Sequence, residues 1–313
     1  MRRTCLRAVP GALLLLPLAA CGDSDPAAAA SGPLGNGVVW ADGSEIHFPG
    51  GEVVDSGQDE PMALSRTSHG VVSSDWDAGT VHVTPDGAVT DLGLPDAVRV
   101  ATDPGQPMVA WMTYEPFDGV LHVLDATTGT EQAAIRTDLE HDLEISLDGD
   151  TAWLHSGGSA TTLRVDWRRG KVTKAPASFV RDVRGHHATV EGGNENFVEA
   201  GVAKPGIVDL RTRRMIRRGW DWAFSPLGTY AVGIFGEDGD STTKNEEIGV
   251  LDLASGRLTR FPIVLGEGGW TEWAWTPDDT SIYWFEGTEL VVCEVATSDC
   301  KRDAVDADQP QVA

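Results

Sequence analysis

The sequence lacks most of the patterns that identify an enzyme or a membrane-spanning protein. None of the motifs G-x-S-x-G, H-E-x-x-H, G-x-G-x-x-G and C-x-x-C occurs, and no phosphate-binding P-loop is present. After the first twenty residues no stretch is apolar enough to cross a bilayer. Basic residues number 24 against 48 acidic ones, so the formal charge of −24 argues against a nucleic-acid partner. Long helical periodicity is also missing, and the many glycine-containing turns indicate an all-β protein. The missing motifs favour a non-enzymatic protein but leave an enzymatic activity open.

The pattern at the start of the chain indicates a targeting segment. Three arginines precede a short apolar stretch centred on four leucines, and this stretch ends in Leu18-Ala19-Ala20-Cys21-Gly22. That ending resembles the lipobox of bacterial lipoproteins. The resemblance implies a signal peptide over residues 1–20, a lipid on Cys21 and a flexible linker over residues 21–36. An ordinary secretory signal with a chance cysteine is the alternative, and the export route, general or twin-arginine, stays open.

Lipidation would place the chain on the extracytoplasmic face of a bacterial cell membrane. Loss of the signal peptide removes three arginines and no acidic residue, so the mature chain becomes more negative. Anionic lipid would repel such a chain, and the lipid on Cys21 must therefore hold it there. In this oxidising compartment Cys293 and Cys300, on either side of an expected hairpin turn, are expected to form a disulfide.

A repeat runs through residues 37–305. A short strand that ends in an acidic residue is followed by a turn and a second strand, and the acidic residues lie 41, 43, 43 and 42 positions apart. This period is typical of a four-stranded propeller blade. Seven hairpins can be counted, which predicts a single all-β propeller with seven four-stranded blades, although six or eight stay open. The acidic positions are Asp125, Asp166, Asp209, Asp252 and Glu294.

A second repeat supports the propeller. The segment from Asp221 to Pro226 aligns with the segment from Glu272 to Pro277, and apolar residues alternate in both as in a packed strand. Their Ser-Pro and Thr-Pro-Asp turns, together with the hairpin at 251–256, resemble the WD40-like and TolB-like bacterial propellers. The resemblance implies the fold and says little about function. The first blade has three strands, so its fourth must come from residues 31–36 or from the tail, residues 306–313.

Acidic residues are expected to gather on one face of the ring. In propellers the inner strands start on the same face on which the loops between second and third strands open. A face so acidic would attract cations or a basic partner, and two tryptophans beside it are candidates for exposed contacts. The alternative is a set of ordinary solvated loops. The candidate residues are Asp142, Asp221 and Glu272 at strand starts, Asp238, Asp240 and Glu246 in a long loop, and Trp220 and Trp270.

Three functions remain open at this stage. The first is a non-enzymatic binding or scaffolding module at the cell envelope that meets a protein or another basic partner. The second is a carbohydrate-binding or hydrolytic propeller that acts at the mouth of the central channel. The third is a calcium-binding propeller, since Asp238-Gly239-Asp240 weakly resembles a calcium loop but lacks its full spacing. We expect no other cofactor, and a monomer.

Basic residues cluster away from the acidic loops. They fall on the expected outer hairpins of two adjacent blades, where charges on edge strands block edge-to-edge aggregation. A docking patch for an anionic surface polymer is the alternative reading. The cluster consists of Arg168, Arg169, Lys171 and Lys174, followed by Arg211, Arg213, Arg214, Arg217 and Arg218.

Overall fold

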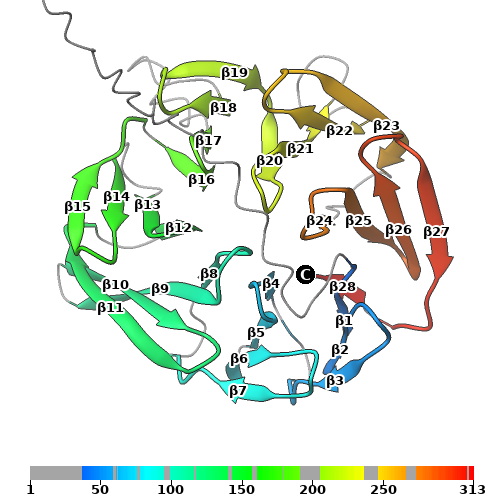
Figure 1. The fold of residues 1–313 in the computed structure, drawn as a ribbon, viewed down its shortest axis with the longest axis horizontal. Helices are drawn as coiled ribbons and strands as arrows, with labels where there is room; N and C mark the ends of the chain where they lie inside the picture. The colour runs from blue at the N-terminus through cyan, green and yellow to red at the C-terminus, as the bar shows by residue number, and fades with distance from the viewer. Residues whose placement is uncertain are drawn as a thin grey trace, which may run out of the picture.

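The structure is a computed structural model, shown as a ribbon in Figure 1. The predicted signal peptide, Cys21 and the predicted linker lie outside the residues that it describes. The described residues are 37–58, 61, 63–75, 78–94, 99–115, 118–139, 143–156, 161–177, 179–190, 205–235, 246–265, 273–308 and 310–313.

Seven four-stranded antiparallel sheets form a ring, which confirms the predicted seven-bladed propeller (Figure 1). We number the blades from the N-terminal end and give their strands from the channel outward. Blade 1 is β28 (Pro310–Val312), β1 (Trp40–Asp42), β2 (Glu45–His47) and β3 (Val53–Asp55); blade 2 is β4 (Ala63–Arg66), β5 (Val71–Asp75), β6 (Gly79–Val83) and β7 (Val89–Asp91); blade 3 is β8 (Ala101–Thr102), β9 (Met108–Glu115), β10 (Asp118–Asp125) and β11 (Thr130–Thr137).

The later four blades follow the same order and contain the clearest copies of the sequence repeat. The acidic residue of each copy ends the third strand of its blade. Blade 4 is β12 (Leu143–Asp148), β13 (Thr151–Ser156), β14 (Thr162–Asp166) and β15 (Lys171–Lys174); blade 5 is β16 (Val180–Arg184), β17 (His187–Val190), β18 (Gly206–Asp209) and β19 (Arg214–Arg218); blade 6 is β20 (Trp220–Phe224), β21 (Tyr230–Phe235), β22 (Glu246–Asp252) and β23 (Leu258–Leu265); blade 7 is β24 (Trp273–Trp275), β25 (Ser281–Glu286), β26 (Glu289–Glu294) and β27 (Cys300–Ala304).

The tail of the chain closes the ring. Strand β28 pairs antiparallel with β1, with Trp40 opposite Val312, and so supplies the inner strand of blade 1. Of the two closing segments considered from the sequence, the structure uses the tail. Three strands from the beginning of the ring and one from its end therefore share one sheet.

The two faces of the ring differ in how they are built. In blades 2 to 7 the turn between the first two strands and the turn between the last two lie on one face, which we call the turn face. In blades 3 to 7 a hydrogen bond joins the two turns, as when the Trp167 amide donates to the Asp150 carbonyl at 3.1 Å and the Leu210 amide to the His186 carbonyl at 2.8 Å. Strand direction puts the connections from second to third strand on the opposite face, the loop face. Loop lengths thus vary on the loop face, whereas hydrogen bonds between turns fix the turn face.

The acidic residue of each repeat organises its turn. The Asp125 carboxylate accepts a hydrogen bond from the Thr127 amide at 2.9 Å, and the Gly129 amide donates to the Asp125 carbonyl at 2.8 Å. Gly129 has a φ of 64°, and Gly256 in the corresponding turn of blade 6 has a φ of 70°. Glycine adopts this left-handed conformation without strain, so the Asp-to-Gly spacing seen in the sequence follows from the geometry of the turn.

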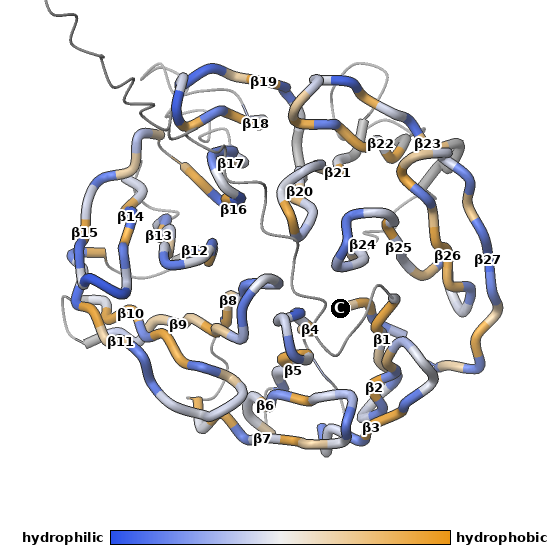
Figure 2. Tube along the Cα trace, in the orientation of Figure 1, coloured by the Kyte–Doolittle hydropathy of each residue, from blue (hydrophilic) through white to orange (hydrophobic). Residues whose placement is uncertain are grey.

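The apolar core lies between neighbouring blades. One cluster joins blades 3 and 4 through Met108, Leu121, Leu147 and Trp167, and another joins blades 6 and 7. Trp222 and Trp275 lie in this core and are each 6% exposed. In Figure 2 hydrophobic and hydrophilic residues alternate along the strands, as blades that pack face to face require. None of the described residues forms a helix with the length and apolar character to span a membrane.

Candidate functional site

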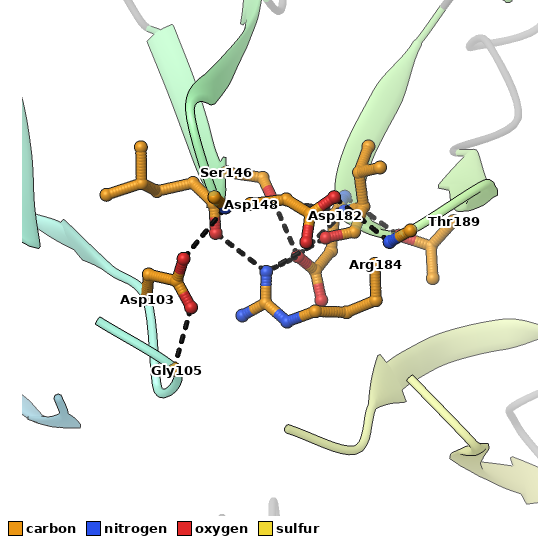
Figure 3. A network of polar contacts seen from close by, with 11 residues as sticks. Asp103, Gly105, Ser146, Asp148, Asp182, Arg184 and Thr189 are labelled. Carbon is orange, nitrogen blue, oxygen red and sulfur yellow. Dashed lines mark hydrogen bonds and ion pairs between the residues drawn. The ribbon is translucent and has the colours of Figure 1, made fainter. Parts of the chain in front are cut away.

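The inner strands of blades 4 and 5 hold a charged network (Figure 3). Ile145 and Leu147 of β12 pack toward blade 3, so the alternate residues Ser146 and Asp148 point toward blade 5. The Ser146 hydroxyl donates to the Asp182 carboxylate at 2.7 Å and accepts from the Val183 amide at 3.0 Å. Two neighbouring blades are thus joined beside the channel by polar groups as well as by apolar packing.

A β-bulge gives β16 its part in this network. The register with β17 shifts between Val180 and Asp182, and the extra residue is Arg181. Its guanidinium forms an ion pair with Glu144 of β12 at 3.5 Å, and the Asp182 amide donates to the Thr189 hydroxyl at 2.9 Å. Bulges redirect side chains, and this one turns the Asp182 carboxylate toward blade 4.

Arg184 lies at the centre of the network and is largely buried, with its side chain 13% exposed. Its Nη1 donates to the Leu147 carbonyl at 2.8 Å and to the Val183 carbonyl at 2.9 Å, and lies 3.7 Å from Asp182 Oδ1. Burial raises the pKa of Asp148, and Arg184 opposes that rise. The Arg184 side chain thus bonds backbone carbonyls of both β12 and β16 and links the two blades.

The network continues into blade 3 through Asp103, which lies in the β8–β9 turn. Asp103 Oδ2 accepts from the Gly149 amide at 2.8 Å and Oδ1 from the Gly105 amide at 2.8 Å, while Asp148 Oδ2 accepts from the Gly185 amide at 3.0 Å (Figure 3). Hydrogen bonds therefore join the turn of blade 3 to that of blade 4, and the turn region of blade 4 to that of blade 5. These carboxylates accept hydrogen bonds from backbone amides of the protein, so their role here is structural.

An equivalent carboxylate joins blades 6 and 7. Asp279, in the β24–β25 turn, is 3% exposed and accepts hydrogen bonds from the Ser225 hydroxyl at 2.6 Å and from the Leu227 amide at 3.0 Å. Burial raises the pKa of Asp279, and these hydrogen bonds act against the rise. Sequence reasoning missed the aspartates of this position. Their signal was their recurrence in the turns between first and second strands, at Asp103, Asp148 and Asp279.

Most residues predicted for the acidic face fall outside the described part of the chain. These are Asp142, Asp238, Asp240, Trp270 and Glu272. Trp220 and Asp221 lie within β20 and Glu246 begins β22, and for these three the backbone alone is described. Trp220 was expected just before its strand and is instead the first residue of the strand.

Strand register places the three remaining candidates at one end of blade 6. Trp220 lies opposite Ile234, Ile234 lies opposite Ile248, and Glu246 precedes Ile248 by two residues. This end of β20 and β22 belongs to the loop face, because the turns of blade 6 lie at the other end of the same strands. The backbone thus brings Trp220, Asp221 and Glu246 to the same face.

A basic patch lies on the outer edges of blades 4 and 5. Arg169 forms an ion pair with Asp166 at 2.8 Å and Arg168 one with Asp150, while Arg211 donates to His186 Nε2 at 2.6 Å. We define the basic patch as the exposed residues Arg168, Arg169, Lys171, Lys174, Arg211, Arg213, Arg214 and Arg218. Among the described residues, the members of this patch other than Arg168 and Arg169 form no ion pair.

The histidines give no metal site within the described residues. No three His, Cys, Asp or Glu side chains there lie close enough to hold an ion. His47, His82 and His122 all lie on the third strand of their blades, and His47 and His122 stack on Trp40 and Trp111. The residues considered for calcium, Asp238 and Asp240, lie outside the described part.

Cys293 and Cys300 form a disulfide in blade 7. The two residues lie opposite each other in β26 and β27, so the bond links the third and fourth strands of the blade. Cys293 is fully buried in the cluster between blades 6 and 7. The bond secures the outermost strand of the last blade before the chain turns inward to β28.

The solved structures similar to this chain have low sequence identity to it. TolB from Acinetobacter baumannii has a TM-score of 0.51 and 12% identity, over 90% of this chain and 66% of TolB. An oligogalacturonate lyase in complex with manganese has a TM-score of 0.51 and 10% identity, over 75% of this chain and 73% of that one. Kuenenia stuttgartiensis hydrazine synthase has a TM-score of 0.50 and 15% identity, over 75% of this chain and 76% of that one.

These similarities establish the fold, including its likeness to the TolB propeller, and leave the function open. No protein-family model matches the chain. No curated protein matches it either. The argument for a function therefore has to come from the residues of this chain.

Proposed function

We propose that the protein is a binding or scaffolding module that a lipid on Cys21 holds on the extracytoplasmic face of a bacterial cell membrane. In this proposal the propeller presents its acidic loop face to a basic protein or another cationic partner. The observation that carries the proposal is that the charged side chains beside the channel bond to groups of the protein itself. Asp103, Asp148, Asp182 and Arg184 are all bonded within the protein, so the charged groups described beside the channel serve to fix the blades.

A rigid ring with variable loops on one face suits binding. Six hydrophobic clusters hold the blades together, and the turn face is tied by hydrogen bonds from turn to turn. Binding residues are commonly placed on loops that a rigid scaffold supports. The acidic character of the loop face comes from the sequence, and it would steer a cationic partner toward these loops.

The proposal is tested by binding and by fractionation. The chain from residue 21 onward, with Cys21→Ser, is titrated with a lysine-rich peptide at low and high salt. Asp221→Asn with Glu246→Gln should weaken binding, whereas Asp299→Asn with Asp303→Asn, which neutralises two exposed acids of blade 7, should not. In cells, Cys21→Ser should release the protein from the membrane fraction. Equal loss in both charge variants, or membrane retention without Cys21, contradicts the proposal.

A further inference from the structure

Charge is distributed unevenly around the ring. Acidic residues outnumber basic ones two to one over the whole chain, yet between Arg164 and Arg218 the basic residues are in the majority. The structure gathers most exposed members of this stretch on β15, β19 and the turns that precede them, while Arg164 and Arg181 lie on β14 and β16. These elements belong to neighbouring blades, seen side by side at the left and top of Figure 1. One corner of a strongly acidic protein is therefore basic.

Protection of edge strands explains only part of this patch. Lys171, Lys174 and Arg214 lie on outermost strands, where charge prevents pairing with another sheet. Arg168 and Arg169, however, lie in the β14–β15 turn, and the β18–β19 turn holds two more arginines. Turn residues present no strand edge to protect. Their charge calls for another explanation.

The turn face is also where the chain enters the ring. Strand β1 is the second strand of its blade and runs from the turn face, so the residues before Trp40 approach from that side. The Ala313 amide donates to the Val39 carbonyl at 3.1 Å and fixes this entry point. The described residues that lead into β1 and the arginines of the two turns therefore share one face of the molecule.

We propose that the basic patch docks on the anionic surface of the lipid bilayer to which the protein is anchored. The rim of blades 4 and 5 would then rest on the lipid headgroups, and the loop face would point away from the membrane. This inference rests on the proposed lipid anchor and deepens it, because it says which way the anchored propeller faces.

The anchor makes a weak electrostatic contact sufficient. A flexible linker of about sixteen residues spans on the order of 20 Å, and such a tether raises the effective concentration of the second site to the millimolar range. Each basic residue near an anionic bilayer strengthens binding about fivefold, which corresponds to about 1 kcal/mol. Free in solution, the acidic chain would be repelled by the anionic bilayer. Once it is tethered there, it can turn its basic patch toward the lipid headgroups.

The test uses lysine reactivity as a local probe. In the chain from residue 21 onward, Cys293 and Cys300 are paired, which leaves Cys21 as the thiol to couple to a maleimide lipid. The coupled protein is bound to vesicles of phosphatidylcholine alone or mixed with phosphatidylglycerol, and lysines are acetylated at low conversion. We expect slower labelling of Lys171 and Lys174 on the mixed vesicles, with Lys301 of β27 unchanged as the internal control.

The control variants match in charge. Arg213→Glu with Arg214→Glu should abolish the protection, because loss of the two positive charges alone weakens docking about 25-fold, about fivefold for each, and the two new negative charges weaken it further. Lys301→Glu with Arg302→Glu makes the same change on the far side of the ring and should leave it intact. Protection should also vanish at 1 M salt, where the screening length falls to about 3 Å.

Three outcomes overturn the inference. Equal slowing of Lys171, Lys174 and Lys301 would reflect the surface potential alone. Protection that survives in the Arg213 and Arg214 variant would place the contact elsewhere. Protection by soluble polyphosphate on neutral vesicles, with none on anionic vesicles, would assign the patch to an anionic polymer. Because the lipid is coupled chemically, all three results are independent of whether cells lipidate Cys21.

Discussion

Removal of one buried hydroxyl should loosen the closure of the ring. Tyr283 of β25 is fully buried, and its hydroxyl donates to the Ala313 carbonyl at 2.6 Å and accepts from Arg66 Nη2 at 2.9 Å. Arg66 comes from β4, so the hydroxyl joins blades 7 and 2 to the tail that completes blade 1. Tyr283→Phe removes these hydrogen bonds and leaves the ring in place.

The expected cost is modest because both of these partners keep another bond. Arg66 Nη2 still donates to the Gly37 carbonyl at 2.7 Å, and the Ala313 carbonyl still accepts from Arg66 Nε at 3.1 Å. The buried Val39 amide also loses its 3.4 Å hydrogen bond to this hydroxyl, and we expect a loss of about 1–2 kcal/mol in unfolding free energy. For a chain of this size that corresponds to a fall in Tm of roughly 2–6 °C.

Two measurements check this reasoning. Urea denaturation gives the loss of stability, and hydrogen exchange should quicken in the peptide that contains β28. Tyr230→Phe is the matched control, since this half-buried ring stacks on Trp275 and should lose little with its hydroxyl. A cycle with Arg66→Met should give a coupling energy of about 1 kcal/mol, as expected for bonded neighbours. Equal stability of Tyr283→Phe and the native chain, with unchanged exchange in β28, would refute the closure role of the hydroxyl.

Three further changes test the account of the interior. Burial lowers the pKa of His82 from 6.5 to about 4, so as the pH falls from 6.5 to 4 the unfolded chain binds a proton that the folded chain does not. The unfolding free energy should therefore fall by at most about 3 kcal/mol over this range. His82→Gln should flatten the plot of unfolding free energy against pH, and an unchanged slope would contradict this reasoning. Asp279→Asn turns an amide donor toward groups that already donate, and should cost about 1–3 kcal/mol in urea unfolding; a neutral effect would argue against the contact with Ser225. Replacement of Cys293 and Cys300 by serine should cost about 2 kcal/mol by the loop-entropy estimate, measured against the oxidised protein, and no loss would mean that the hairpin is already ordered in the unfolded chain.

The propeller could be predicted because its repeat consists of turn residues whose roles depend on nearby residues only. An acidic residue that caps a turn and a glycine with positive φ recur once per blade, and alternation marks the strands between them. The closing strand could not be fixed in the same way. Pro310-Gln311-Val312 is too short to carry an alternating pattern, and its partner β1 lies at the other end of the sequence.

The site was harder to predict than the fold for a physical reason. Asp103, Asp148 and Asp279 read in the sequence as ordinary turn residues, and only the packing of blades shows that each bonds the turn of a neighbour. The pairing of Arg66 with Tyr283 likewise joins blades that are not adjacent in sequence. The basic patch was visible from the sequence as a cluster, whereas its position beside the entry of the chain needed the strand order.

The pairing of β28 with β1 sets an order of events when the chain folds. Blades 2 to 7 are each made of consecutive strands, so their contacts are local and can form early. Blade 1 must wait for Val312 to meet Trp40 across nearly the whole chain, a contact of the highest loop-closure cost in the molecule. Until then β1 presents an unpaired edge, which is a template for domain swapping and aggregation. The rate at which this last strand docks, more than the stability of any single blade, would then govern how much of the newly made chain reaches the closed ring.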